Sequence, residues 1–234
     1  MKLSLSVGQI PVLLRGDPDS ISKWIQRWNT SQMLLYVAVI ILGTGLYGAA
    51  MGLWRDPLQA VYTAIKFPLI ILLTALGNAL LNGMLALLLG LNIGFRQSLV
   101  AVLMSFTIAA VILGSFSPLM LFLVWNSPPI SQQELSNSTH SFILLTQVVV
   151  IAFAGVVANL RLVQLLQRLS GSQPIARKIL FAWLAGNLFL GSQLSWILRP
   201  FIGAPHLPIQ FLRPNAFQGS FYETVFHALR NLFS

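Results

Sequence analysis

The chain has 234 residues, and its composition excludes an ordinary water-soluble globule. Hydrophobic residues make up 56% of the chain and charged residues only 8%, whereas soluble proteins carry about 25% charged residues. The absence of cysteine rules out disulfides, a thiolate nucleophile and cysteine-ligated metal clusters. The net charge of +9 comes from basic residues scattered singly between apolar stretches, which fits lipid headgroups and not nucleic acid.

Residues 1–32 precede the first long apolar stretch, and we expect them to lie in the cytoplasm without a cleavable signal peptide. Within them, residues 17–28 repeat apolar side chains at helical spacing beside two basic residues. This pattern predicts an amphipathic helix in the inner headgroup region or, alternatively, a helix that fits the groove of a soluble partner. The apolar stripe consists of Ile21, Trp24, Ile25 and Trp28.

Residues 33–198 hold five stretches that are long and apolar enough to cross a bilayer, which takes about 20 residues of helix. Pro68 suits the first turn of the second stretch, Pro118 is expected to kink the third or end it early, and Pro200 stops the fifth. The sequence therefore predicts an all-α polytopic membrane protein, a bundle of five transmembrane helices with an amphipathic helix at each end. The predicted spans are 33–54, 67–91, 98–125, 142–162 and 179–198.

The basic residues orient this bundle, because cytoplasmic loops retain lysine and arginine. Residues 126–141 contain neither, residues 163–178 contain Arg168, Arg177 and Lys178, and Lys66 is assigned to the first outer loop. We therefore expect a multi-pass protein of a bacterial plasma membrane, with its N-terminus in the cytoplasm and its C-terminus outside. Tryptophan favours membrane interfaces; we expect Trp24, Trp28 and Trp183 near the inner one and Trp54, Trp125 and Trp196 at the outer one.

Six amide side chains fall inside the predicted spans. Interhelical hydrogen bonds from such groups stabilise packing by about 0.6 kcal/mol each, so we expect the amides to hold helices together; lining a polar passage is the alternative. The small-residue pairs Gly48 with Gly52 and Ala182 with Gly186 also predict close helix contacts. The six amides are Asn78, Asn82, Gln147, Asn159, Asn187 and Gln193.

All carboxylates and histidines lie outside the predicted spans. A proton relay or an intramembrane catalytic acid would need such a group inside a span. The sequence also lacks a nucleophile elbow and a phosphate-binding glycine loop. We therefore predict no enzymatic activity, no cofactor and no metal. Glu223 and His227, four residues apart, could form a metal site with His206, but a solvated polar helix face is the preferred interpretation.

Residues 199–234 are predicted to form an external cap, a proline-rich segment followed by an amphipathic helix that starts at a Ser220–Glu223 capping box. We expect the proline-rich segment to pack over the outer mouth of the bundle; a docking surface or a lid over a cavity is the alternative. The arginines of this segment are available to anionic headgroups or ligands. The cap residues that we single out are Arg199, Pro200, Phe201, Gly203, Pro205, Pro208, Arg213 and Glu223.

Residues 193–203 read QLSWILRPFIG, and this stretch, with residues 208–213, 219–223 and the AIKFP sequence at 64–68, resembles a family of uncharacterised bacterial multi-pass inner-membrane proteins. The five-span layout is also similar to that of Yip1-type membrane proteins, which are associated with trafficking. These resemblances imply location and architecture, and they carry no catalytic residues to this chain.

The leading hypothesis from sequence is a non-enzymatic membrane scaffold or accessory subunit. It would bind membrane lipids and a membrane protein partner, or form a homo-oligomer, through its terminal helices and the cap. The alternative is a permease or channel for a neutral or anionic small solute, built on the amides inside the spans.

Overall fold

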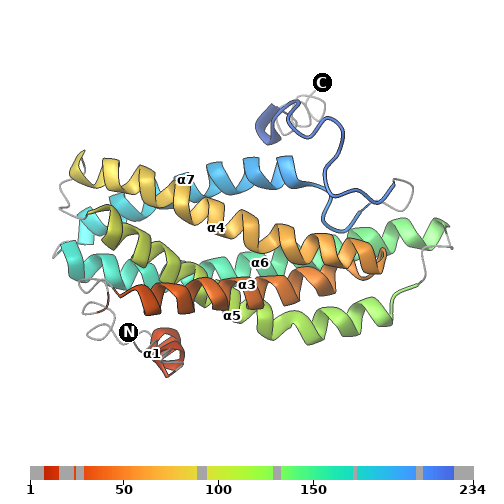
Figure 1. Cartoon of the computed structure of the whole chain (residues 1–234), viewed down its shortest axis with the longest axis horizontal. Coiled ribbons are helices and arrows are strands. Elements are labelled where there is room, and N and C mark those ends of the chain that lie inside the picture. Colours follow the sequence, from red (N-terminus) through yellow and green to blue (C-terminus); the bar gives the residue numbers. More distant parts are fainter. Residues whose placement is uncertain are drawn as a thin grey trace.

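The computed structural model describes residues 8–15, 24, 29–88, 94–128, 133–170, 173–203 and 208–223. These residues form helices joined by short turns, with no strand among them: α1 (Gln9–Arg15), α3 (Thr30–Gly52), α4 (Pro57–Leu88), α5 (Phe95–Trp125), α6 (Gln133–Ser170) and α7 (Gln173–Leu198). The five long helices run side by side along the longest dimension of the molecule (Figure 1). The predicted all-α class is confirmed.

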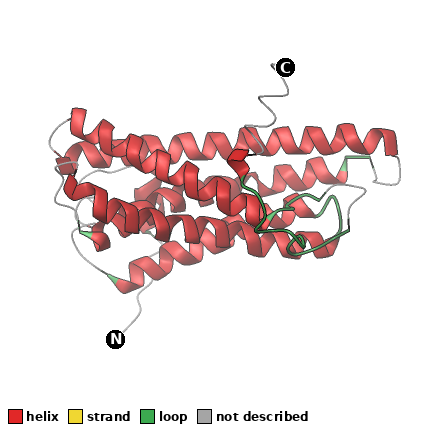
Figure 2. Ribbon diagram, turned by 90° about the horizontal axis from the view of Figure 1, so that it is seen from above, coloured by secondary structure: helices red, strands yellow, loops and turns green. Residues whose placement is uncertain are grey.

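The helices pack in a definite order. Helix α3 contacts α4 and α5, α4 also contacts α5 and α7, and α6 contacts α5 and α7. Residues 199–203 and 208–216, which we call the cap, cross over one end of the bundle (Figure 2). We refer to this end as the cap end.

Four helices are long and apolar enough to cross a membrane: Thr30–Gly52, Pro57–Leu81, Phe95–Trp125 and Phe142–Leu162. Helix α7 is not among them, because polar residues such as Asn187 and Gln193 interrupt its apolar sequence. The chain is thus an integral membrane protein by this criterion, and the count of five spans stays a prediction. Large apolar side chains point away from the bundle on the four spans, as lipid contact requires, including Leu42, Leu46, Val61, Phe122 and Val149.

Helix α4 starts ten residues before the predicted span, at Pro57 instead of residue 67. The Asp56 carboxylate accepts a hydrogen bond from the Leu58 amide at 2.7 Å, and Pro57 occupies the first helical position, where its missing N–H costs nothing. Lys66 was therefore assigned wrongly to a loop, and Pro68 lies inside the helix instead of in its first turn.

Helix α5 continues through Pro118 to Trp125, so the predicted end at residue 125 is confirmed and the alternative of an early end at Pro118 is wrong. At its other end the helix begins at Phe95, close to the predicted start at residue 98. The predicted fourth span, 142–162, agrees with the apolar part of α6, although α6 itself runs farther in both directions.

The glycine pair on α3 brings that helix against the backbone of α4. A Cβ atom at Gly48 would lie 2.6 Å from the Thr63 carbonyl oxygen, and one at Gly52 would lie 2.6 Å from that of Gln59. Neither position has room for a larger side chain, because real Cβ contacts are longer than 3.0 Å. The prediction that Gly48 and Gly52 mark a close helix contact is confirmed.

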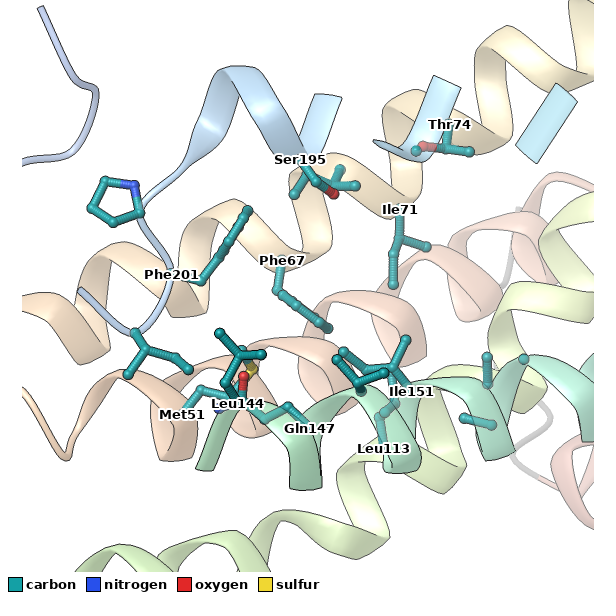
Figure 3. Close-up of a pocket in the computed structure, with 18 of the residues that line it drawn as sticks. Met51, Phe67, Ile71, Thr74, Leu113, Leu144, Gln147, Ile151, Ser195 and Phe201 are labelled. Carbon is teal, nitrogen blue, oxygen red and sulfur yellow. The ribbon is translucent and has the colours of Figure 1, made fainter. Parts of the chain in front are cut away.

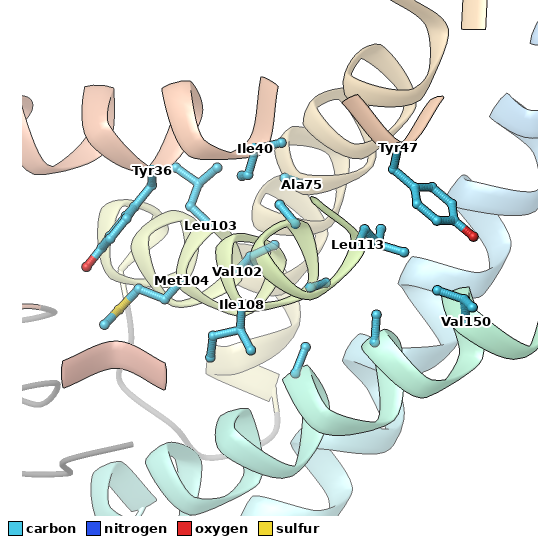
Figure 4. Packing of buried hydrophobic residues seen from close by; sticks show 14 of the residues in the cluster. Tyr36, Ile40, Tyr47, Ala75, Val102, Leu103, Met104, Ile108, Leu113 and Val150 are labelled. Atoms are coloured by element: carbon cyan, nitrogen blue, oxygen red, sulfur yellow. The ribbon is translucent and has the colours of Figure 1, made fainter. Parts of the chain in front are cut away.

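The apolar core lies between α3, α5 and the neighbouring helices (Figure 4). Tyr36, Ile40 and Tyr47 of α3 are fully buried there. Trp183 of α7 belongs to the same cluster with 1% exposure, and its predicted place near the inner interface stays a prediction.

At the N-terminal end, α1 packs on α5 and buries Leu13. The amphipathic helix predicted for residues 17–28 lies outside the described residues except for Trp24, which is helical and half-buried against the core. Trp28 also lies outside them.

Candidate functional site

Three polar side chains of α4 form a ladder that faces the cap. Gln59, Thr63 and Lys66 follow one another at helical spacings of four and three residues, so they share one face of the helix. All three are fully buried. Sequence analysis singled out none of them as a site.

The ladder holds the backbone of the cap by hydrogen bonds. Gln59 Nε2 donates to the carbonyl oxygens of Pro200 at 3.1 Å and Phe201 at 2.6 Å. The Thr63 hydroxyl donates to the Phe201 oxygen at 2.7 Å, and Lys66 Nζ donates to the Pro200 oxygen at 2.8 Å. Four hydrogen bonds thus fix two consecutive cap carbonyls against α4.

Aromatic rings surround the Lys66 ammonium. Its Nζ lies 5.0 Å from the ring centre of Phe211, 5.9 Å from that of Tyr62 and 6.0 Å from that of Phe201. No carboxylate lies among its partners in the described part of the chain. A cation inside a span costs at least about 2.5 kcal/mol, and here the carbonyl and ring faces offset part of that cost.

After the two carbonyls that the ladder holds, the cap turns at Gly203, whose φ of +82° is a left-handed value that favours glycine. Before it, Arg199 folds back on α7: its guanidinium carbon lies 3.3 Å from the Trp196 ring centre and its Nη1 donates to the Trp196 oxygen at 2.7 Å. The side chain of Ile202 in the cap is buried, with 5% exposure. The predicted packing of this segment over the bundle mouth agrees with this arrangement.

Beneath the cap lies a cavity of about 620 Å³ between α4, α5, α6 and α7 (Figure 3). Its walls are almost entirely apolar. Pro200, Phe201 and Gly203 of the cap close one end, together with Arg213. The aliphatic and aromatic wall includes Met51, Phe67, Ile71, Leu113, Leu144 and Ile151.

The cavity ends about halfway along the helices. Its deepest wall residues on α6 and α7 are Gly155 and Asn187. Beyond them, the buried side chains of Ala158, Leu162 and Trp183 belong to the packed core. Among the described residues the cavity is therefore a blind pocket that ends within the bundle, and not a passage through it.

Two buried polar groups in the cavity wall have no hydrogen-bond partner. They are the Thr74 hydroxyl and the Gln147 side-chain nitrogen, on residues that are 3% and 4% exposed. A buried polar group without a partner costs about 1–3 kcal/mol. The apolar cavity thus offers hydrogen bonds at two places to whatever occupies it.

A second cavity of about 470 Å³ adjoins the first at the cap and shares Pro200, Gly203 and Arg213 with it. This one is polar: Arg199 and Arg213 line it with Gln210 and Asn215. Burial lowers the pKa of the Arg199 guanidinium, and the nearby charge of Arg213 lowers that pKa further. The two arginines therefore lie close enough to repel each other.

The amides predicted inside the spans have different roles. Asn78 Nδ2 donates to the Asn187 side-chain oxygen at 2.6 Å and to the Trp183 carbonyl at 3.3 Å, so this pair joins α4 to α7 as expected. Gly186 packs directly against Asn78, with only 2.7 Å between a Cβ at Gly186 and the Asn78 oxygen. The side chain of Asn82 lies outside the described residues.

The other three amides make no bond between spans within the part of the chain that the structure describes. Asn159 donates to the Gly155 oxygen in its own helix, and Gln147 lines the cavity without a partner for its nitrogen. Gln193 accepts a hydrogen bond from the Phe221 amide at 3.4 Å, which ties α7 to the end of the described chain. For these three residues, interhelical bonding within the bundle stays a prediction.

The predicted capping box at Ser220 and Glu223 is confirmed. The Ser220 amide donates to the Glu223 carboxylate, and the Glu223 amide donates to the Ser220 hydroxyl, both at 3.1 Å. Tyr222 between them stacks on Phe189 of α7 with ring centres 5.5 Å apart. The rest of the predicted helix, Pro205, His206 and His227 lie outside the described residues, and Pro208 lines the polar cavity.

Within the described residues, no three acidic, cysteine or histidine side chains gather where they could hold a metal ion.

Three of the predicted interface tryptophans lie near the cap end. Trp125 is 76% exposed, Trp54 is buried with its Nε1 directed to the Pro128 oxygen at 3.4 Å, and Trp196 is half-buried beneath Arg199.

Comparison of the chain with known protein families, curated proteins and solved structures found no match. The resemblance to uncharacterised bacterial membrane proteins and to Yip1-type proteins therefore stays a prediction from sequence.

Proposed function

We propose that this chain is a non-enzymatic integral membrane protein that binds a membrane lipid and holds one of its acyl chains in the apolar cavity. The blind, apolar cavity beneath the cap carries this proposal. Its volume of about 620 Å³ lies within the range of about 300–1,000 Å³ for ligand pockets. Among the described residues no carboxylate lines it, and its polar lining residues are Thr74, His140, Gln147, Asn187, Ser195 and Arg213.

The proposal includes five crossings of the membrane. Helix α7 has 26 residues and packs lengthwise on α4, which crosses, so we place it in the same bilayer despite its polar residues. An odd number of crossings puts the beginning and the end of the transmembrane bundle on opposite sides of the membrane. We keep the cytoplasmic N-terminus in a bacterial plasma membrane, as the basic residues indicate.

The blind inner end of the cavity argues against the permease or channel alternative. Asn78 and Asn187, which would have lined a passage, pair with each other at 2.6 Å next to the buried Trp183. A scaffold or accessory role remains our proposal for the protein as a whole. A pull-down from native membranes in mild detergent tests it, because an accessory subunit brings down a stoichiometric partner.

Lipid binding can be tested by filling the cavity. A Cβ at Gly155 meets nothing within 4 Å, and Gly155 lines the cavity, so Gly155→Phe directs a ring into the cavity space. Val156→Phe adds the same ring one residue away, on a side chain that is 59% exposed on the outside of the bundle. Native mass spectrometry of the purified full chain should show bound phospholipid in wild type and Val156→Phe, with at least about tenfold weaker binding in Gly155→Phe.

A phospholipid with a photoreactive acyl chain gives a second readout. Crosslinks should map to the cavity wall on α4, α6 and α7 and disappear in Gly155→Phe. Equal lipid binding by both phenylalanine variants would overturn the proposed function.

A further inference from the structure

The polar cavity at the cap adjoins the apolar one, and the two share three lining residues. A ligand that fills both must be apolar in one part and polar in the other. Membrane lipids have this form, and the shared position at the end of the transmembrane helices is where a lipid headgroup lies. The chemistry of the headgroup can be read from the charges of the polar cavity.

The charged side chains that the described residues bring to the polar cavity are positive. Arg199 and Arg213 line this cavity, and no carboxylate of the described residues does. Behind it, the Lys66 ammonium contacts the same cap segment through the Pro200 carbonyl and the ring of Phe211. Like charges that are partly withdrawn from water repel one another, and an anion among them removes that repulsion.

The two guanidinium groups also have donors to spare. Arg199 uses Nη1 on the Trp196 carbonyl and stacks on the Trp196 ring, which fixes its plane, while its buried Nε has no partner. In the described part of the chain, the side chain of Arg213 makes no hydrogen bond and no ion pair. A planar fork of N–H donors matches the oxygens of a phosphate group, which it can bind with two parallel hydrogen bonds.

We propose that the polar cavity binds the phosphate of an anionic glycerophospholipid, with Arg213 as the main ligand and Arg199 as the second, while an acyl chain of that lipid fills the apolar cavity. This inference rests on the proposed function and adds the headgroup class. A zwitterionic choline headgroup would bring a further positive charge to Arg199, Arg213 and Lys66, so the site should discriminate against it.

The test uses two lipids with the same acyl chains, dioleoyl phosphatidylglycerol and dioleoyl phosphatidylcholine, titrated onto the delipidated full chain. Wild type should bind phosphatidylglycerol at least about tenfold more tightly. Arg213→Gln should remove most of that preference, because it should weaken phosphatidylglycerol binding more than phosphatidylcholine binding. Arg213→Lys should retain part of it, because it keeps the charge and loses the fork.

Lys178→Gln is the matched control. It removes one exposed positive charge near the start of α7, whereas the cap follows the end of that helix. It should bind both lipids as wild type does. If Arg213→Gln and Lys178→Gln have equal effects, the preference comes from general charge and the proposed phosphate site is wrong. Thermal unfolding of each variant checks that the loss is not one of folding.

Two further outcomes separate the headgroup inference from the proposed function. In one outcome, Gly155→Phe loses the binding of both lipids, and Arg213→Gln leaves the preference for phosphatidylglycerol unchanged. That result would overturn the headgroup inference and support the acyl-chain cavity. Inorganic phosphate is the remaining arm: if it binds wild type and Gly155→Phe equally and phosphatidylglycerol does not displace it, the site takes a free anion and the lipid assignment fails.

Discussion

Glycine has opposite roles in two regions of the bundle, the contact between α3 and α4 and the wall of the apolar cavity. Where α3 meets α4, Gly48 and Gly52 let one helix rest on the carbonyl groups of the other. In the cavity wall on α6 and α7, Gly155 meets nothing within 4 Å and Gly191 only the Thr74 side chain at 3.7 Å or more. The first region is packed without space and the second encloses a cavity. A small residue in a membrane helix therefore marks either a contact or a vacancy, and only its neighbours decide which.

The largest effect that separates the two regions should come from adding one methyl group to each. Gly48→Ala forces the methyl against the Thr63 carbonyl and should destabilise the protein by about 1–3 kcal/mol, the usual cost of overpacking. Gly155→Ala adds the same methyl to open space and should be neutral or stabilising, by up to about 1 kcal/mol, because alanine favours the helix. Circular dichroism during thermal unfolding in detergent measures both. Similar shifts in the two variants would refute the comparison.

A second test concerns the ladder that holds the cap on the cavity side. The double variant Gln59→Leu with Thr63→Val removes three of the four hydrogen bonds to the cap carbonyls. Each is worth about 1 kcal/mol net, so the cap should open at least about tenfold more often. A thiol introduced by Ile202→Cys, in a chain without native cysteine, should then react with maleimide correspondingly faster.

The matched position for this experiment is Phe217→Cys, because Phe217 is 80% exposed. Its thiol should react at the same rate with and without the ladder. An unchanged rate at position 202 would mean that the ladder does not control the cap.

The smallest effect should come from the amides between α4 and α7. Asn78→Leu removes the bonds to Asn187 and to the Trp183 carbonyl and should cost about 0.6–1.7 kcal/mol. Asn159→Leu removes only a bond within α6 and should cost less. Equal losses of unfolding free energy would show that Asn78 does not join the two helices.

The sequence was sufficient for the features that depend on local pattern. Apolar length located the spans at 98–125 and 142–162, and glycine spacing located the contact at Gly48 and Gly52. The capping box at Ser220 is equally local, since its two partners are three residues apart.

The start of α4 was missed because polar residues precede its apolar stretch. The Asp56–Pro57 pair, an N-cap followed by proline, was the available signal. With the helix extended to Pro57, the regular spacing of Gln59, Thr63 and Lys66 becomes visible. The hydrogen-bond partners of these side chains cannot be found from the sequence, because the acceptors are backbone carbonyls more than 130 residues away. The cavity likewise depends on how α6 and α7 approach α4, which no single helix encodes.

The distance along the chain between the ladder and the cap has a consequence for biogenesis. Pro200 is synthesised 134 residues after Lys66, so the ammonium enters the bilayer before the carbonyl that will accept its hydrogen bond exists. Until translation reaches the cap, the polar face of α4 must be satisfied by water, by a lipid headgroup or by the insertion machinery. The cavity faces of α4, α5 and α6 likewise stay uncovered until α7 and the cap are made, which gives a lipid from the surrounding bilayer time to bind there first.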